Sequence, residues 1–129
     1  MMSNPRAAYM GASVSTASPA RLLTMLCERL VLDVTRGRNA QADGDHAEAH
    51  RQLVHAQEIV LELRMSLQVD AWDGGPQLAS IYDFLHSELI RANISKDLAR
   101  TEGCLRLVTD LCDTWREAAL QAASVPSVA

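Results

Sequence analysis

The feature that most constrains this chain is a helical spacing of apolar residues, which recurs in four segments separated by short polar breaks. Residues 18–19, Ser-Pro, predict a helix start, because serine caps free N–H groups and proline at the first helical position loses no hydrogen bond. Breaks follow at residues 43–45, Asp-Gly-Asp, and 73–76, Asp-Gly-Gly-Pro, with a weaker one near 95–97 that lacks Gly and Pro. We therefore expect helices near 19–42, 45–68, 76–95 and 97–122.

Each expected helix carries one apolar stripe at alternating spacings of three and four, which is a candidate core seam. Seams of this period pack helices at about 20 degrees, and short connections make neighbouring helices antiparallel. The predicted fold is all-α, an antiparallel up-down four-helix bundle in a single domain over 1–129. We expect a mobile N-terminal capping segment over 1–17 and a flexible tail over 123–129. The seams are Leu23, Leu26, Leu30 and Val34; Ala49, Leu53, Ala56, Val60, Leu63 and Leu67; Leu78, Tyr82, Leu85, Leu89 and Ala92; and Leu105, Val108, Cys112, Trp115 and Ala119.

The charge pattern bears on possible partners. The 12 Lys and Arg residues are scattered among 16 Asp and Glu, and the formal net charge is −4. Without a basic run, the sequence predicts no nucleic-acid partner and no attraction to an anionic membrane. It contains no run of about 18 apolar residues, so no membrane insertion is expected. The first residues lack the continuous apolar stretch of a signal peptide, which indicates a cytoplasmic protein.

The three cysteines form no CxxC pair. Cys27, Cys104 and Cys112 each fall on or beside an apolar helix face, where an unpaired cysteine acts as a small hydrophobic residue. We expect all three to be buried.

A second set of apolar residues lies away from the core seams. On the second helix, Ala47, Val54, Leu61 and Met65 project to the side opposite the seam, where a helix of a lone bundle is normally polar. One interpretation is that the N-terminal segment or the bundle's own irregularity covers these residues, or that they are ordinary single exposed side chains. The other is an extended docking surface for an amphipathic partner. Further members of the set are Met25 and Leu32 on the first helix and Cys104, Leu107, Leu111 and Ala118 on the fourth.

The sequence offers no pattern typical of catalysis or metal binding. His46 and His50 are one helical turn apart, but the text is His-Ala-Glu-Ala-His, whereas the zincin motif needs Glu directly after the first His. A di-iron bundle needs Glu-x-x-His on two helices, and none occurs. His55 and His86 are expected at the surface or its boundary. We therefore predict no enzyme activity, no cofactor and no metal site, with five glutamates off the seams: Glu28, Glu58, Glu62, Glu88 and Glu117.

Several motifs, in order, resemble the flagellin-specific export chaperones of bacterial flagella. The opening has Tyr9, then Val14, then residues 16–19, Thr-Ala-Ser-Pro, entering the first long helix. The segments AHRQLVHAQEIVLEL, IYDFLHSELIRANISKD and DTWREA resemble the family's second helix, third helix and the end of its fourth. The similarity covers roughly residues 7–119.

This resemblance implies a fold and a function. The family is built as an antiparallel four-helix bundle that binds the disordered C-terminal segment of flagellin, prevents premature polymerisation and presents the client to a flagellar export gate component. The second apolar set gives a physical reason for such binding. The alternative is a helical adaptor or regulator that binds an amphipathic helix of another partner. We expect a monomer or weak homodimer, in which the N-terminal segment covers part of the docking surface until a partner displaces it. The candidate partner-binding residues are Tyr9, Met10, Val14, Met25, Leu32, Val54, Leu61, Met65, Leu107 and Leu111.

Overall fold

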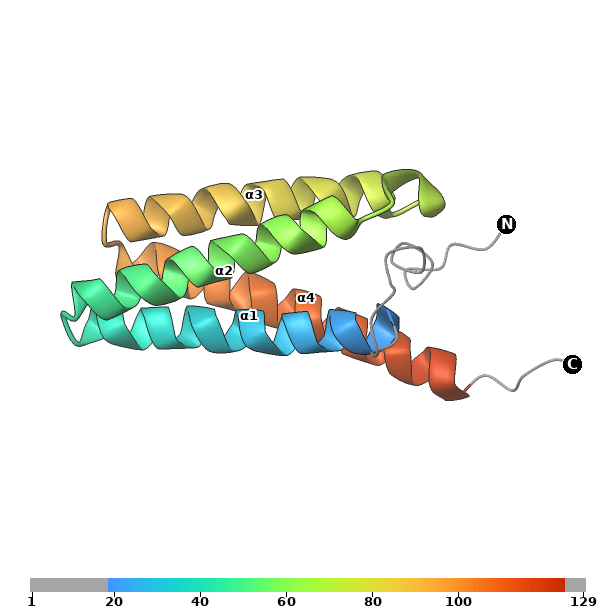
Figure 1. Cartoon of the computed structure of the whole chain (residues 1–129), viewed down its shortest axis with the longest axis horizontal. Helices are drawn as coiled ribbons and strands as arrows, with labels where there is room; N and C mark the ends of the chain where they lie inside the picture. Colours follow the sequence, from blue (N-terminus) through green and yellow to red (C-terminus); the bar gives the residue numbers. More distant parts are fainter. Residues whose placement is uncertain (1–18, 125–129) are drawn as a thin grey trace, which may run out of the picture.

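In a computed structural model, which describes residues 19–124, the chain folds into four long helices. They are α1 (Pro19–Ala42), α2 (His46–Ser66), α3 (Gly75–Ile94) and α4 (Leu98–Ser124), and a short 3₁₀ helix, η2 (Val69–Ala71), lies between α2 and α3. Figure 1 shows successive helices running in opposite directions. Going round the bundle, α1 packs on α2, α2 on α3, α3 on α4, and α4 back on α1. The described residues contain no strand, and the predicted all-α four-helix bundle is confirmed.

The helix boundaries follow the predicted breaks with small differences. The bounds of α1 are those expected. At the start of α2, Asp45 of the predicted break is the N-cap, and its side chain accepts a hydrogen bond from the N–H of Glu48. The helix ends at Ser66, two residues before the expected end, because Leu67 turns to extended backbone. In α4 the first residue is Leu98 rather than 97, since Asp97 caps the helix by accepting from the N–H of Arg100. The same helix runs through Ser124, two residues beyond the expected end.

The connection between α3 and α4 lacks glycine, and Lys96 takes its place. This residue has φ of 53°, in the left-handed region that a helix C-terminus often requires and that glycine normally fills. The N–H of Lys96 donates to the carbonyl of Asn93, and the N–H of Asp97 donates to that of Ala92. The weakest break in the sequence is therefore a complete helix stop, and it is made by a lysine, a residue type that does not predict one.

The predicted seams form one continuous core. All six seam residues of α2 and all five of α3 are buried. In α1 and α4 most are buried, whereas Leu26 and Leu105 are partly exposed and pack against the core. The side chain of Ala119 lies outside what the structure describes. Cys27, Cys104 and Cys112 are buried, as predicted.

One polar cluster is enclosed between α1 and α2. The side chain of Asp33 is fully buried, and its Oδ1 accepts a hydrogen bond from Arg29 Nε at 2.8 Å. Its other carboxylate oxygen contacts His55 Nδ1. Because a buried carboxylate without a partner is costly, these two half-exposed side chains make the position tolerable.

Candidate docking groove

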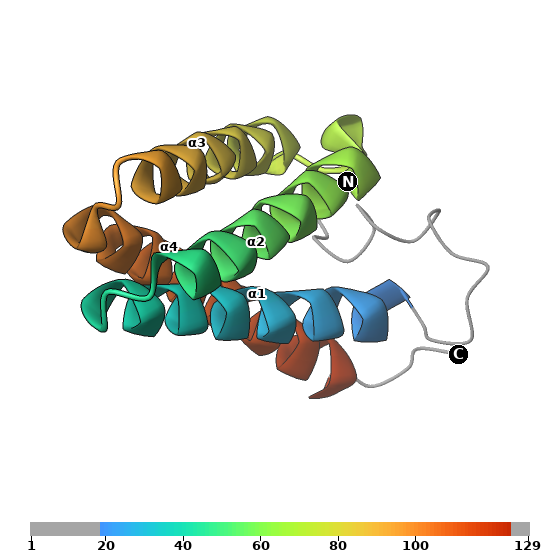
Figure 2. The same ribbon diagram turned by 60° about the vertical axis from the view of Figure 1, so that its left-hand side comes forward.

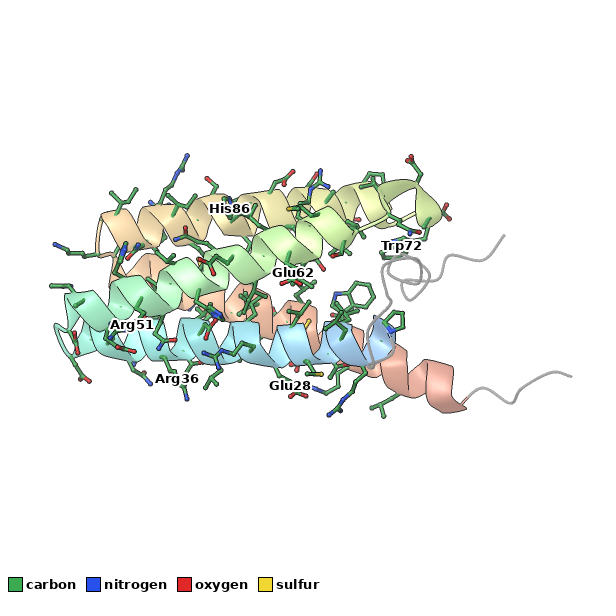
Figure 3. The ribbon with its side chains drawn as sticks, viewed as in Figure 1. Glu28, Arg36, Arg51, Glu62, Trp72 and His86 are labelled. Carbon is green, nitrogen blue, oxygen red and sulfur yellow. The ribbon has the colours of Figure 1, made fainter. Side chains whose placement is uncertain are left out.

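An apolar groove lies between α3 and α4, at the end of the bundle where η2 joins α2 to α3. Its volume is about 390 Å³. Figure 3 shows Trp72 at this end of the molecule. The walls are mainly apolar, and Gln77, Asp110 and Thr114 supply most of the polar groups. The apolar lining consists of Trp72, Leu78, Ile81, Leu107, Leu111, Trp115 and Ala118.

Two tryptophans from distant parts of the sequence meet at this groove. Trp72 follows η2 and Trp115 belongs to α4, and their ring centroids are 6.4 Å apart with an interplanar angle of 57°. Trp115 is largely buried, so it serves the core and the groove wall together. The Trp72 indole N–H is buried and has no hydrogen-bond partner among residues 19–124.

Residues 73–76 explain how the chain reaches this position. A Cβ atom on Gly75 would lie 1.8 Å from the carbonyl oxygen of Val69, and one on Gly74 would lie 2.4 Å from the Trp72 ring. Only glycine lets η2 and the indole pack so closely on the start of α3. The Gly-Gly pair, predicted as a helix break, thus also shapes one end of the groove.

The predicted partner-binding residues are divided among three faces. Leu107 and Leu111 line the groove and also pack against the core. Val54, Leu61 and Met65 lie on the outer face of α2, and we call these three residues the α2 patch. Tyr9, Met10 and Val14 lie outside the described residues.

Met25 and Leu32 occupy a third face, on the outside of α1. Glu28 and Arg36 point away from the bundle on this helix (Figure 3). The two apolar side chains are therefore set among charged ones. Cys104, which belongs both to the second apolar set and to the cysteines expected to be buried, lies in the core.

The α2 patch is bracketed by two polar contacts between α2 and α3. Arg64 Nε lies 3.1 Å from Asp83 Oδ1, and His50 Nδ1 lies 2.9 Å from Asn93 Nδ2. Leu61 and Val54 fall between these crossings, and Met65, 81% exposed, lies just beyond one. The patch therefore runs along the outer α2–α3 side, separate from the groove.

Sequence reasoning missed several residues at these surfaces. Trp72 and Ile81 line the groove, and Phe84, three residues after Ile81 and 59% exposed, lies on the same side of α3. Ile94, at the other end of α3, is also exposed. All three α3 residues lie off the seam. A search of α3 for apolar residues that project away from its seam, as was made for the second helix, would have found them. No local signal marks Trp72, because its role depends on Trp115.

The opposite end of the bundle, which we call the closed end (residues 38–50 and 88–102), is joined by polar contacts. The connections of α1 to α2 and of α3 to α4 both lie there (Figure 2). These are hydrogen bonds between different helices, and each of the four helices takes part in at least one. They are Arg38 Nη2 to Glu102 Oε2 at 3.0 Å, Gln41 Nε2 to the Ala92 carbonyl at 3.1 Å, Asn93 Nδ2 to His50 Nδ1 at 2.9 Å, and Arg100 Nη1 to Glu88 Oε1 at 2.9 Å.

In the part of the chain that the structure describes, no three His, Cys, Asp or Glu side chains gather as a metal site would need. His50 and His55 have the protein partners already named. None of the described helices is both long and apolar enough to cross a bilayer.

The fold and the surface together are those of a four-helix bundle with an apolar groove between two of its helices. Comparison with known sequences specifies the class further. The family described as "Flagellar protein FliS" matches residues 2–122. The chain belongs to this family.

Three relatives carry the description "Flagellar secretion chaperone FliS". The protein from Bacillus subtilis is 32% identical over 118 residues, covering 89% of this chain and 86% of the relative. The Escherichia coli protein is 27% identical over 110 residues, covering 84% and 81%. The Vibrio cholerae protein is 24% identical over 103 residues, covering 79% and 76%. The expected export-chaperone role is thereby supported, and a chaperone is not a class of enzyme.

Proposed function

We propose that this chain is a cytosolic export chaperone that binds the disordered C-terminal segment of flagellin, keeps it from polymerising and delivers it to the flagellar export apparatus. The observation that carries the proposal is the apolar groove between α3 and α4 in a member of a secretion chaperone family. The groove residues Ile81 and Leu107 stay partly exposed although the core is complete. A client can therefore bury them without unfolding the bundle.

The groove suits an amphipathic client helix. The apolar side of such a helix would contact Ile81 and Leu111, while its polar side would face Asp110 and Thr114 at the rim. Burial of apolar area provides the driving force, and ordering of the disordered client opposes it. The result is an affinity high enough to protect the client and low enough for export machinery to reverse.

The α2 patch is the second contact in this proposal. Leu61 and Met65 are too exposed to serve the core, and they lie on a different side of the bundle from the groove. A client that wraps around the bundle would place a further apolar stretch on them. The proposal includes neither Met25 nor Leu32, because these residues stand singly on a charged face.

The N-terminal residues complete the proposal. Tyr9, Met10 and Val14 would cover part of the docking surface in the free protein, which would be a monomer or weak homodimer. Displacement by the client would then free Tyr9 for contact with an export gate component. This step rests on the family resemblance of the opening residues.

A calorimetric titration tests the function. The full chain should bind full-length flagellin and should lose that binding when the flagellin lacks its C-terminal segment. Equal affinity for both forms would place the contact elsewhere on the client and would contradict the proposal.

Replacement of Leu61 by Asp tests the second contact. We expect folding to change by no more than about 0.5 kcal/mol, because the residue is exposed. Binding should weaken, since a client would have to desolvate the new charge. Leu32→Asp, at an exposed leucine on α1, is the matched control. A folded Leu61→Asp variant, checked by circular dichroism, that binds as tightly as the control would exclude the α2 patch from the contact.

A further inference from the structure

Two cysteines that the chaperone role leaves unused meet between α1 and α4. Cys27 and Cys112 are 3% and 2% exposed. The Cys112 thiol donates a hydrogen bond to the Cys27 backbone carbonyl, with Sγ 3.4 Å from the oxygen. The two side chains also lie close enough for each to shift the pKa of the other. Residues 85 apart in sequence are thus held side by side, in the reduced state, by the packing of the bundle.

The two thiols differ in acidity. Interaction with the neighbouring Cys112 side chain lowers the pKa of Cys27, against the opposing effect of burial. Interaction with the Cys27 side chain, together with burial, raises the pKa of Cys112. Cys27 is therefore the thiol that ionises first. A thiolate with a neighbouring thiol is the arrangement in which oxidation proceeds to a disulfide.

Cys104 provides an internal comparison. It is buried to the same extent, on the same helix as Cys112, and burial raises its pKa to about 11. Neither Cys27 nor Cys112 is among the groups that shift its pKa. Its position predicts an inert thiol.

We propose that Cys27 and Cys112 are a redox modification site, at which a peroxide converts the two thiols into an intramolecular disulfide that joins α1 to α4. The Cys27 thiolate attacks one peroxide oxygen, forming a sulfenic acid and releasing hydroxide, which takes up a proton to become water. The Cys112 sulfur then attacks the Cys27 sulfur, and the sulfenic oxygen leaves as a second water. Two thiols and one hydrogen peroxide thus give one disulfide and two waters.

The bond would act on the docking groove through α4. Cys112 follows Leu111 and precedes Trp115 by one turn, and both of these residues line the groove. A disulfide would fix this turn of α4 against α1 and would close a long loop, which restricts the unfolded chain. The oxidised protein should unfold at a higher denaturant concentration than the reduced protein.

The test treats the purified full chain with hydrogen peroxide, then alkylates it under denaturing conditions and maps its peptides by mass spectrometry. We expect two of the three thiols to resist alkylation, a mass loss of about 2 Da for two hydrogens, and one linked peptide pair containing Cys27 and Cys112. A thiol reductant should reverse the change. Cys104→Ala should keep the linked pair, and Cys27→Ala and Cys112→Ala should lose it.

The wild-type peptide map decides the matter even if a variant fails to fold. Three alkylatable thiols after peroxide treatment would overturn the proposal. So would a bond that involves Cys104, a bond between two chains, or oxidation of Cys27 to a sulfinic acid without a bond to Cys112.

Discussion

The closed end and the groove end of the bundle are held together by different means. At the closed end, side chains such as Arg38, Gln41 and Arg100 bond to groups on other helices, so that α3 is tied to each of the other three. At the groove end, α3 and α4 line a groove of about 390 Å³ whose walls are mainly apolar. Polar bonds have directional requirements, whereas apolar contacts can be exchanged for others of similar size.

This difference indicates how one small bundle can both fold and accept a client. The closed end fixes the register of the helices, with Asp97 and Asp45 capping the two helices that leave it. The groove end leaves apolar side chains of the groove partly exposed, where a client can cover them. A client that binds there exchanges water for protein without breaking a bond that the fold requires.

The largest effect is expected for Trp115→Ala, which removes a side chain that serves both the core and the groove. We predict a loss of about 3 to 5 kcal/mol in the free energy of unfolding, together with weaker client binding. Leu89→Ala, at the closed end, should cost about 2 to 5 kcal/mol and leave the affinity of the folded protein unchanged. Denaturant titration and calorimetry measure both quantities. A Trp115 variant of normal stability that cannot bind would make this residue a docking residue alone.

A smaller effect is expected in the cluster between α1 and α2. Replacing both Arg29 and His55 by Ala leaves the buried Asp33 carboxylate without a charged partner, and should cost about 2 to 3 kcal/mol. Asp33→Asn is the control, and should cost less, because its two partners are half exposed and can return to water. A larger loss of unfolding free energy for Asp33→Asn than for the double variant would contradict this account. It would mean that attraction between Asp33 and its two partners gives a net stabilisation of the fold.

The smallest effect on stability is expected at the closed end, for Lys96→Gly. Glycine adopts the left-handed conformation without steric cost, although it also gains freedom in the unfolded chain. We predict a net stabilisation of about 0.5 to 1 kcal/mol by denaturant titration, with unchanged binding. A loss of stability would mean that the Lys96 side chain makes a favourable contact that outweighs its backbone strain.

The sequence predicted most of the fold because the signals are local. Residues 18–19 and 43–45 predict where helices begin and end, and the seams predict which side of each helix is buried. The stop at Lys96 was harder to place, since it uses a residue with no preference for the left-handed conformation. The C-terminal end of α2 was placed two residues too late, because Leu67 is apolar and in register with the seam, yet lies after the helix.

The candidate site was predicted only in part. The helical period shows that Leu61 and Leu107 lie off their seams, but it does not show which neighbouring helix stands beside them. The structure therefore divides one predicted surface among separate faces. The role of Trp72 in the groove could not be predicted from the sequence. Its position depends on the contact of η2 with Gly75 and on a tryptophan more than forty residues away.

The most direct test of this account compares two isoleucines of α3 that lie at opposite ends. Ile81 lines the groove, and Ile94 is exposed near the closed end. Each is changed to Glu, and binding of the flagellin C-terminal segment is measured by calorimetric titration. We predict that Ile81→Glu lowers the affinity at least about tenfold, equivalent to about 1.4 kcal/mol, while Ile94→Glu binds as the unmodified chain does. Equal affinities for the two folded variants, or a loss confined to Ile94→Glu, would contradict the assignment of the groove as the docking site.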